Sequence, residues 1–80
     1  MENNQNGLLG RITTNPGIFA GKPIIRRIRF RVNDVLEMMA IGMPKDMILE
    51  EHPILEAKDI EACLLYASFI VNNTPFVNTA

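Results

Sequence analysis

The fold is decided by residues 32–53, which read VNDVLEMMAIGMPKDMILEEHP. In the first part of this stretch, apolar side chains recur at the spacing of an amphipathic helix, which Asn33 is placed to cap (Val32, Val35, Leu36 and Met39). Gly42 supplies a left-handed stop, and Pro44 suits the first turn of a next helix, where its missing N–H is harmless. The stretch therefore predicts two short helices joined by a tight turn.

The second helix is expected to be amphipathic. Its apolar side chains, Met47 and Ile48, should point inward, and its carboxylates should face water (Asp46, Glu50 and Glu51). It is expected to end near His52, because Pro53 disfavours helical geometry in the residue before it. A third helix is expected to begin at Glu56 or Ala57 and to end before a flexible C-terminal tail at residues 72–80.

This third helix is apolar on every side from Ala62 to Val71. Such a helix is buried on more than one face. A chain of 80 residues buries only about 60% of the surface that its unfolded form exposes, so a lone core is marginal. The second face is therefore expected to contact another chain in a homodimer, through Leu64, Leu65, Phe69 and Ile70.

The N-terminal part follows a different pattern. Residues 1–10 are polar and are expected to form a flexible tail, which leaves a single domain at residues 11–71. A short strand at residues 11–13 is stopped by a turn, and residues 24–32 alternate apolar residues with arginine, which predicts a strand with one arginine face. The expected fold class is mainly α: a three-helix, helix-turn-helix-like domain with a short N-terminal β element, acting as a dimer.

Charge is distributed unevenly along the chain. Residues 1–31 carry six basic side chains and one acidic one, a net charge of +5, whereas residues 32–80 carry two basic and eight acidic ones, a net charge of −6. The second and third helices begin with carboxylates, which repel phosphates, so these helices are poor DNA readers. The better nucleic-acid candidates are Lys22, Arg26, Arg27, Arg29 and Arg31.

Two alternatives to DNA binding remain open for these basic residues. They can pair with the acidic helices, within the chain or across a dimer, since the two charges nearly balance. They can also bind RNA, although Phe30 alone is available there for base stacking.

Catalysis is not expected. One histidine, His52, and one cysteine, Cys63, cannot form a disulfide, a metal cluster or a catalytic pair, and Cys63 is expected to be a small core residue. No enzyme activity, cofactor, metal or small-molecule substrate is predicted. The apolar run at residues 62–71 is about half the ~20 residues that a membrane helix needs, so we expect no membrane contact. A reduced thiol and no recognisable export signal favour a cytoplasmic protein.

Several motifs resemble one prokaryotic family, known as domain-of-unknown-function family 433. The resemblance opens with Arg11-Ile12-Thr13, Asn15-Pro16-Gly17-Ile18 and Gly21-Lys22-Pro23-Ile24-Ile25-Arg26. It continues through Val32, Leu36-Glu37-Met38, Gly42-Met43, Ile48-Leu49 and Pro53, and ends with Asp59-Ile60, Ala62, Leu64 and Tyr66-Ala67. At two places the chain departs from the family pattern: Arg27 stands where the family has a glycine turn, and Pro44 and Glu56 stand where it has Ser or Thr helix caps.

The resemblance implies a helix-turn-helix-like fold. It also implies an antitoxin-like autoregulator, which binds operator DNA as a dimer and masks a PIN-like nuclease toxin with another surface. The alternative from a different class is a protein-interaction module that never touches nucleic acid, in which the apolar last helix and the acidic face hold a basic partner.

Overall fold

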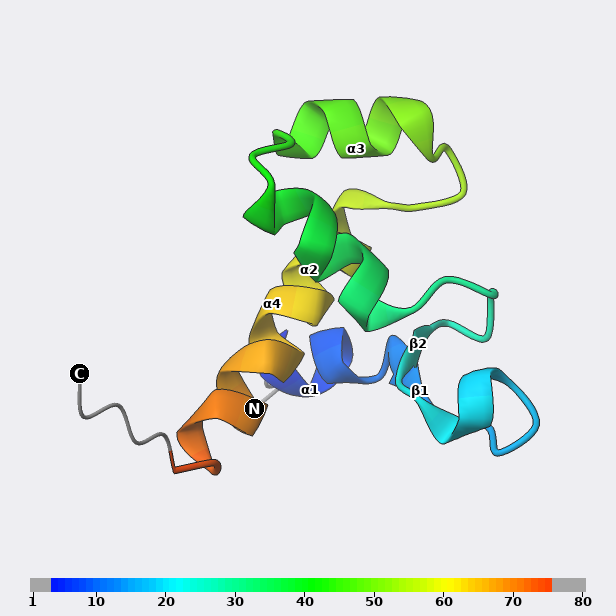
Figure 1. Cartoon of the computed structure of the whole chain (residues 1–80), viewed down its shortest axis with the longest axis vertical. Coiled ribbons are helices and arrows are strands. Elements are labelled where there is room, and N and C mark those ends of the chain that lie inside the picture. Colours follow the sequence, from blue (N-terminus) through cyan, green and yellow to red (C-terminus); the bar gives the residue numbers. More distant parts are fainter. Residues whose placement is uncertain (1–3, 76–80) are drawn as a thin grey trace.

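The computed structural model describes residues 4–75, with side chains from Gly7 onward. In chain order its elements are helix α1 (Asn4–Leu9), strand β1 (Ile12–Thr13), the 3-10 helix η1 (Phe19–Gly21), strand β2 (Ile24–Ile25) and helices α2 (Val32–Ala40), α3 (Lys45–Glu51) and α4 (Ala57–Asn72). Figure 1 shows α3 above α2, α4 running diagonally past α2, and the two short strands to one side. The predicted fold class, mainly helical with a short N-terminal β element, is confirmed.

The pair α2 and α3 follows the apolar periodicity closely. Val35 is fully buried in α2 and Ile48 in α3, and Gly42 between the helices has a φ of +94°, a conformation that glycine adopts without strain. Two details of the prediction are wrong. Asn33 lies inside α2 and donates to Glu37 instead of capping the helix, and Met47 is 42% exposed because it lies on the outer side of α3.

Helices α2 and α4 begin without a Ser or Thr cap. In each, an aspartate side chain in the first turn accepts a hydrogen bond from the backbone N–H of the residue that precedes the helix. The backbone N–H of Arg31 donates to Asp34 Oδ2 at 3.1 Å before α2, and that of Glu56 donates to Asp59 Oδ2 at 2.8 Å before α4. Both carboxylates also lie at the positive end of the helix dipole, where negative charge is favoured.

The strands β1 and β2 are antiparallel, with Ile12 opposite Ile25 and Thr13 opposite Ile24. The strand predicted for residues 24–32 is wrong after Ile25, because the chain turns there and comes back. Ile25 N donates to the carbonyl of Phe30 at 3.0 Å and closes this turn. The alternation of apolar and basic residues arises because the turn, rather than a strand, places the apolar ones against the core.

One hydrophobic core joins the strands and the helices. Its buried members are Ile25, Val32, Val35, Ile48, Leu55, Ile60 and Cys63, with Met38, Met39 and Met43 packed against them. Burial and the nearby Asp59 charge raise the pKa of the Cys63 thiol to about 12, so it remains protonated. The interpretation of Cys63 as a core residue is confirmed.

The two predicted tails are described in part. Residues 4–9, placed in the N-terminal tail by the prediction, form α1, which packs against α4. At the other end α4 continues to Asn72, and residues 1–3 and 76–80 lie outside the described part of the chain. Among the residues described, none of the helices has the length and apolar character needed to cross a membrane.

Candidate nucleic-acid interface

Asp59, in the first turn of α4, is fully buried and accepts four hydrogen bonds. Arg26 donates to it twice, from Nε to Oδ1 at 2.9 Å and from Nη2 to Oδ2 at 2.8 Å. Arg11 donates from Nη1 to Oδ1 at 2.9 Å, and the backbone N–H of Glu56 supplies the fourth bond. We call Asp59, Arg11, Arg26 and Glu56 the Asp59 cluster.

These bonds keep Asp59 ionised. Burial raises the pKa of the Asp59 carboxyl, but the hydrogen bonds from Arg26, the Glu56 backbone and Arg11 outweigh it, and the pKa lies below its ordinary value. Arg11 also donates to Glu56 Oε1 at 2.8 Å. The cluster therefore contains two arginines and two carboxylates, which balance in charge.

The Asp59 cluster holds the N-terminal segment against the start of α4. Arg26 reaches the carbonyl of Ile54 at 3.0 Å, and its backbone N–H donates to the carbonyl of Arg11 at 2.7 Å. Arg26 is thus fixed by both its side chain and its backbone, and it fixes the position of the residues that follow.

Residues 26–29 form an exposed bend that we call the arginine turn. Arg26 and Arg27 have φ angles of 43° and 64°, in the left-handed region that non-glycine residues rarely occupy. The turn is closed on its inner side by the hydrogen bond from Ile28 N to the Ile25 carbonyl at 2.8 Å. Arg27 thus adopts a backbone conformation that glycine takes without strain.

Three of the five predicted nucleic-acid contacts are exposed: Lys22, Arg27 and Arg29. Within residues 4–75 these three side chains form no ion pair with a carboxylate. They come from the arginine turn and from the segment just before β2, so the two segments that flank β2 carry three exposed basic groups.

The other two predicted contacts have internal partners. Arg26 belongs to the Asp59 cluster, and Arg31 binds Asp34 through Nη2 at 2.8 Å and Nε at 3.3 Å. The Arg31 guanidinium also lies 5.4 Å from the centre of the Phe19 ring. Pairing with the acidic helices, left open by the sequence, is thus found within the chain for Arg26 and Arg31.

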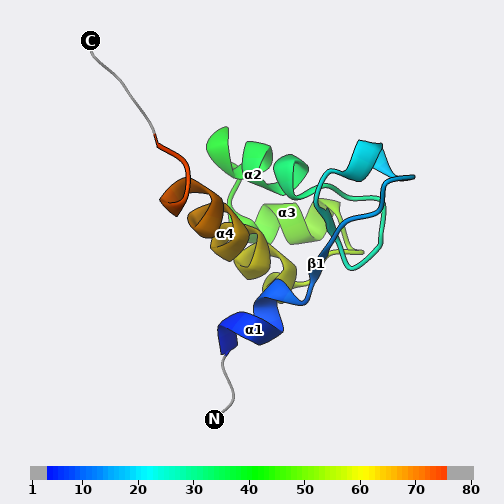
Figure 2. The same cartoon turned by 90° about the horizontal axis from the view of Figure 1, so that it is seen from below.

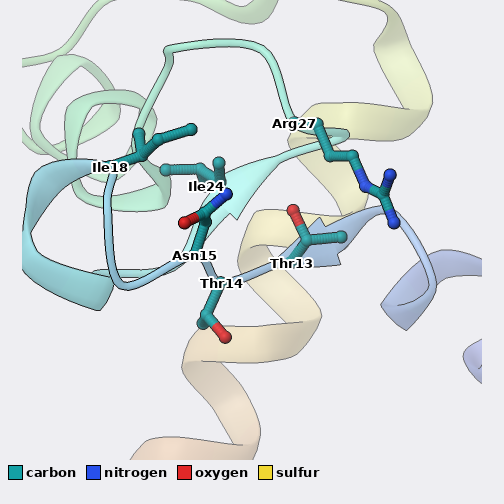
Figure 3. A pocket seen from close by; sticks show the side chains of 6 residues that line it. All are labelled: Thr13, Thr14, Asn15, Ile18, Ile24 and Arg27. Atoms are coloured by element: carbon teal, nitrogen blue, oxygen red, sulfur yellow. The ribbon is translucent and has the colours of Figure 1, made fainter.

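A cavity of about 310 Å³ lies beside the arginine turn. Its walls come from the turn after β1 and from β2, and its lining residues are Thr13, Thr14, Asn15, Ile18, Ile24 and Arg27. In Figure 3 the Arg27 side chain runs alongside Thr13, while Asn15 and Ile18 lie toward the other side of Ile24. The sequence reasoning missed this site, because nothing local to residues 13–18 indicates that Arg27 folds back beside them.

The four residues predicted for a dimer interface lie between the middle of α4 and its C-terminal end. Leu64, Phe69 and Ile70 are 46%, 40% and 49% exposed, and Leu65 is partly buried. Ile70 also lines an apolar groove of about 300 Å³ between α4 and α2. We call Leu64–Val71 the α4 end. Figures 1 and 2 both place its last turns and η1 at opposite sides of the molecule.

The residues that the structure describes contain no group of three His, Cys, Asp or Glu side chains able to hold a metal ion. Phe30, the one aromatic residue available for base stacking in the RNA alternative, is partly buried and packs edge-on against His52, with ring centres 5.1 Å apart.

Comparison with known proteins identifies one family. The model of a protein family of unknown function, DUF433, matches residues 12–67. An uncharacterized protein of Sinorhizobium fredii, y4eO, is 36% identical over 56 residues, which are 70% of this chain and 25% of that protein. The chain thus corresponds to about a quarter of that relative. No solved structure matches.

Proposed function

From the premise that this chain belongs to the DUF433 family, we propose that it is an antitoxin-like autoregulator. It binds operator DNA through Lys22, Arg27 and Arg29 and a protein partner through the α4 end. In this proposal the protein is cytoplasmic, acts as a homodimer, and has a PIN-like nuclease toxin as its partner.

The DNA-binding part of the proposal rests on a difference among the basic residues that the structure describes: some are exposed without a partner, and others are bound within the chain. Lys22, Arg27 and Arg29 are exposed and have no carboxylate partner in the described part of the chain, whereas Arg26 is bound to buried Asp59. Phosphate contacts by lysine and arginine supply most of the affinity for DNA, and fixed contacts lose less entropy on binding. Arg26 and Arg31 therefore serve to position the surface that the other three present.

The α4 end supports the proposed dimer. From Leu64 to Thr74 the chain has no charged residue, and Leu64, Phe69 and Ile70 are exposed apolar side chains. In a twofold dimer each patch meets its own copy, so a patch without charge meets itself without repulsion. A second copy on this surface also compensates for the marginal core of a short chain.

A second candidate function is a protein-interaction module without nucleic-acid binding. It is favoured by α3, whose Asp46, Glu50 and Glu51 are exposed and present an acidic surface. A basic partner, such as a nuclease, is attracted to such a surface, and the α4 end offers apolar contact area. This candidate leaves Lys22, Arg27 and Arg29 without a role.

DNA binding measured at two salt concentrations separates the two candidates. The protein is titrated with the duplex upstream of its own gene and with a scrambled duplex. We expect tighter binding to the upstream duplex and affinity that falls steeply with salt. The variant Arg27→Gln/Arg29→Gln should bind more weakly and lower the salt slope by about two, one for each lost phosphate contact.

The matched control is Lys45→Gln/Lys58→Gln, which removes the same charge. Both lysines lie outside the arginine turn and pair with Glu61 at 3.7 and 3.8 Å. This control should retain most of the affinity. Equal losses in the two double variants would contradict a specific surface, and no binding at low salt would favour the protein-interaction module.

A further inference from the structure

We propose that the cavity beside Arg27 is a seat for one phosphate group. This inference deepens the proposed function and rests on it, since a phosphate of bound DNA is the expected occupant. Its lining residues come from three parts of the N-terminal segment, β1, the turn after it and the arginine turn, with β2 as the floor.

The polar side chains around the cavity all have hydrogen-bond donor groups. Arg27 has no ion pair among the described residues, and a guanidinium only donates. The oxygen of the Asn15 side chain accepts from the backbone N–H of Gly17 at 2.8 Å, which leaves the Asn15 side-chain N–H groups for a ligand. The lining set contains no aspartate or glutamate, so nothing in it repels an anion.

The hydroxyl of Thr13 is the observation that points to a ligand. Its oxygen is buried and has no hydrogen-bond partner in the part of the chain that the structure describes. Buried polar atoms are almost always paired, so an exception needs an explanation, and a bound ion is one such explanation. The pairing of Thr13 with Ile24 in the β1–β2 ribbon fixes Thr13 at the cavity wall.

The strained backbone at Arg27 supports the same conclusion. A φ of 64° is unfavourable for arginine, and the turn nevertheless keeps this residue, whose side chain runs alongside Thr13 (Figure 3). A guanidinium, an amide and a hydroxyl line this one cavity, and such donors match the acceptor oxygens of a phosphate group. Arg29, two residues later in the same turn, is exposed and does not line the cavity.

The test is a titration of the full chain with inorganic phosphate, followed by amide NMR shifts, beside sodium chloride at equal ionic strength. Phosphate is expected to shift the amides of residues 13–18 and Ile24, and chloride is not. Arg27→Gln should weaken this response by about tenfold, the effect of one lost charge-assisted hydrogen bond. Arg29→Gln, which carries the same charge change, should leave it nearly intact.

A second variant tests the hydroxyl directly. Thr13→Val keeps the shape of the side chain and should weaken phosphate binding while the protein stays folded. Equal responses to phosphate and chloride, or equal effects of Arg27→Gln and Arg29→Gln, would overturn the phosphate seat.

The same amides are then followed with duplex DNA, so that the two proposals can fail separately. If the duplex shifts the cavity amides as phosphate does, the seat holds a phosphate of the DNA backbone. If phosphate shifts these amides and the duplex does not bind, the cavity binds free phosphate or phosphate esters, and the proposed DNA binding is wrong. If the duplex binds but neither phosphate nor the duplex shifts these amides, the proposed DNA binding is supported and the proposed phosphate site is wrong.

Discussion

Arg26 and Arg27 are neighbours in the chain with the same left-handed backbone, yet their side chains lie in opposite surroundings. Arg26 donates twice to buried Asp59 and once to the carbonyl of Ile54. Arg27 is exposed, lines a cavity, and has no carboxylate partner within residues 4–75. A single buried carboxylate thus decides which of the two arginines is held in the fold and which stays exposed.

The two arginines are also expected to contribute differently to the free energy of unfolding. An exposed arginine contributes little to stability, because solvent screens its charge. A buried carboxylate behaves differently, since removing one member of its hydrogen-bonded pair leaves the other charge without compensation. Substitutions at the Asp59 cluster are therefore expected to change stability, and substitutions in the exposed part of the arginine turn are expected to change binding.

The largest effect is expected for Asp59→Asn. The variant keeps the shape of the side chain but leaves Arg11 and Arg26 without their shared negative partner, and it should lower the free energy of unfolding by about 3 kcal/mol. Urea denaturation followed by circular dichroism measures this loss. The control Asp46→Asn alters an exposed carboxylate on α3 and should change stability by less than about 0.5 kcal/mol. Similar losses in both variants would contradict a structural role for the Asp59 cluster.

A smaller loss is expected for Arg26→Gly. Glycine relieves the positive φ, but it removes the two bonds to Asp59 and the bond to the Ile54 carbonyl. Because Asp59 keeps Arg11 and the Arg26 side chain is partly exposed, we expect a net loss of about 2 kcal/mol. The same denaturation measurement gives the value. A gain in stability would mean that backbone strain, and not the ion pair, dominates at this position.

Helices α2, α3 and α4 were predictable from the sequence because their signals are local, whereas α1 lies in the segment expected to be a tail. The apolar spacing from Val32 to Met39, Gly42 and Pro53 gave the bounds of α2 and α3 within a residue or two. The arginine turn was not predictable in the same way. Alternation of apolar and basic residues fits a strand as well as a turn packed on a core, and no glycine marks the left-handed residues.

The role of Asp59 depends on contacts that no local pattern contains. The sequence interpretation counted it among helix-start carboxylates that repel phosphates. Its partners Arg11 and Arg26 lie 48 and 33 residues earlier in the chain. The overall charge asymmetry indicated that pairing of this kind is possible, but the choice of Arg26 over Arg27 is made by the turn geometry.

Acid should weaken the Asp59 cluster in a predictable direction. Burial raises the pKa of Asp59 and the hydrogen bonds from Arg26, Glu56 and Arg11 lower it by more, so the folded pKa lies below the unfolded value of about 3.9. The stabilisation is present above about pH 4 and is lost as pH falls through the folded pKa. Asp34 contributes with the same sign, because the hydrogen bond from Arg31 lowers its pKa.

The measurement is the urea midpoint between pH 6 and pH 3. The midpoint should fall toward pH 3, because the stabilisation from the ionised Asp59 carboxyl is lost as pH falls through its lowered pKa. In Asp59→Asn itself the acid dependence should be shallower. An unchanged acid dependence in that variant would show that other carboxylates cause the effect.

The smallest change, and the one of opposite sign, is expected for Arg27→Gly. The φ of 64° is unfavourable for arginine by about 1–2 kcal/mol, and glycine adopts it freely. The added freedom of glycine in the unfolded chain removes part of this gain, so we expect the free energy of unfolding to rise by about 0.5 kcal/mol. Arg29, whose φ is not positive, provides the control, since Arg29→Gly adds the same freedom without relieving strain and should be slightly destabilising.

The value of this last substitution is that stability and binding should move in opposite directions. Arg27→Gly removes a proposed phosphate contact, so affinity for the upstream duplex should fall although the fold becomes more stable. Strained residues that are kept at the expense of stability are typical of binding sites. If Arg27→Gly raises stability and leaves DNA affinity unchanged, the strain at Arg27 has no connection with binding. The contrast between Arg26 and Arg27 would then be a property of the fold alone.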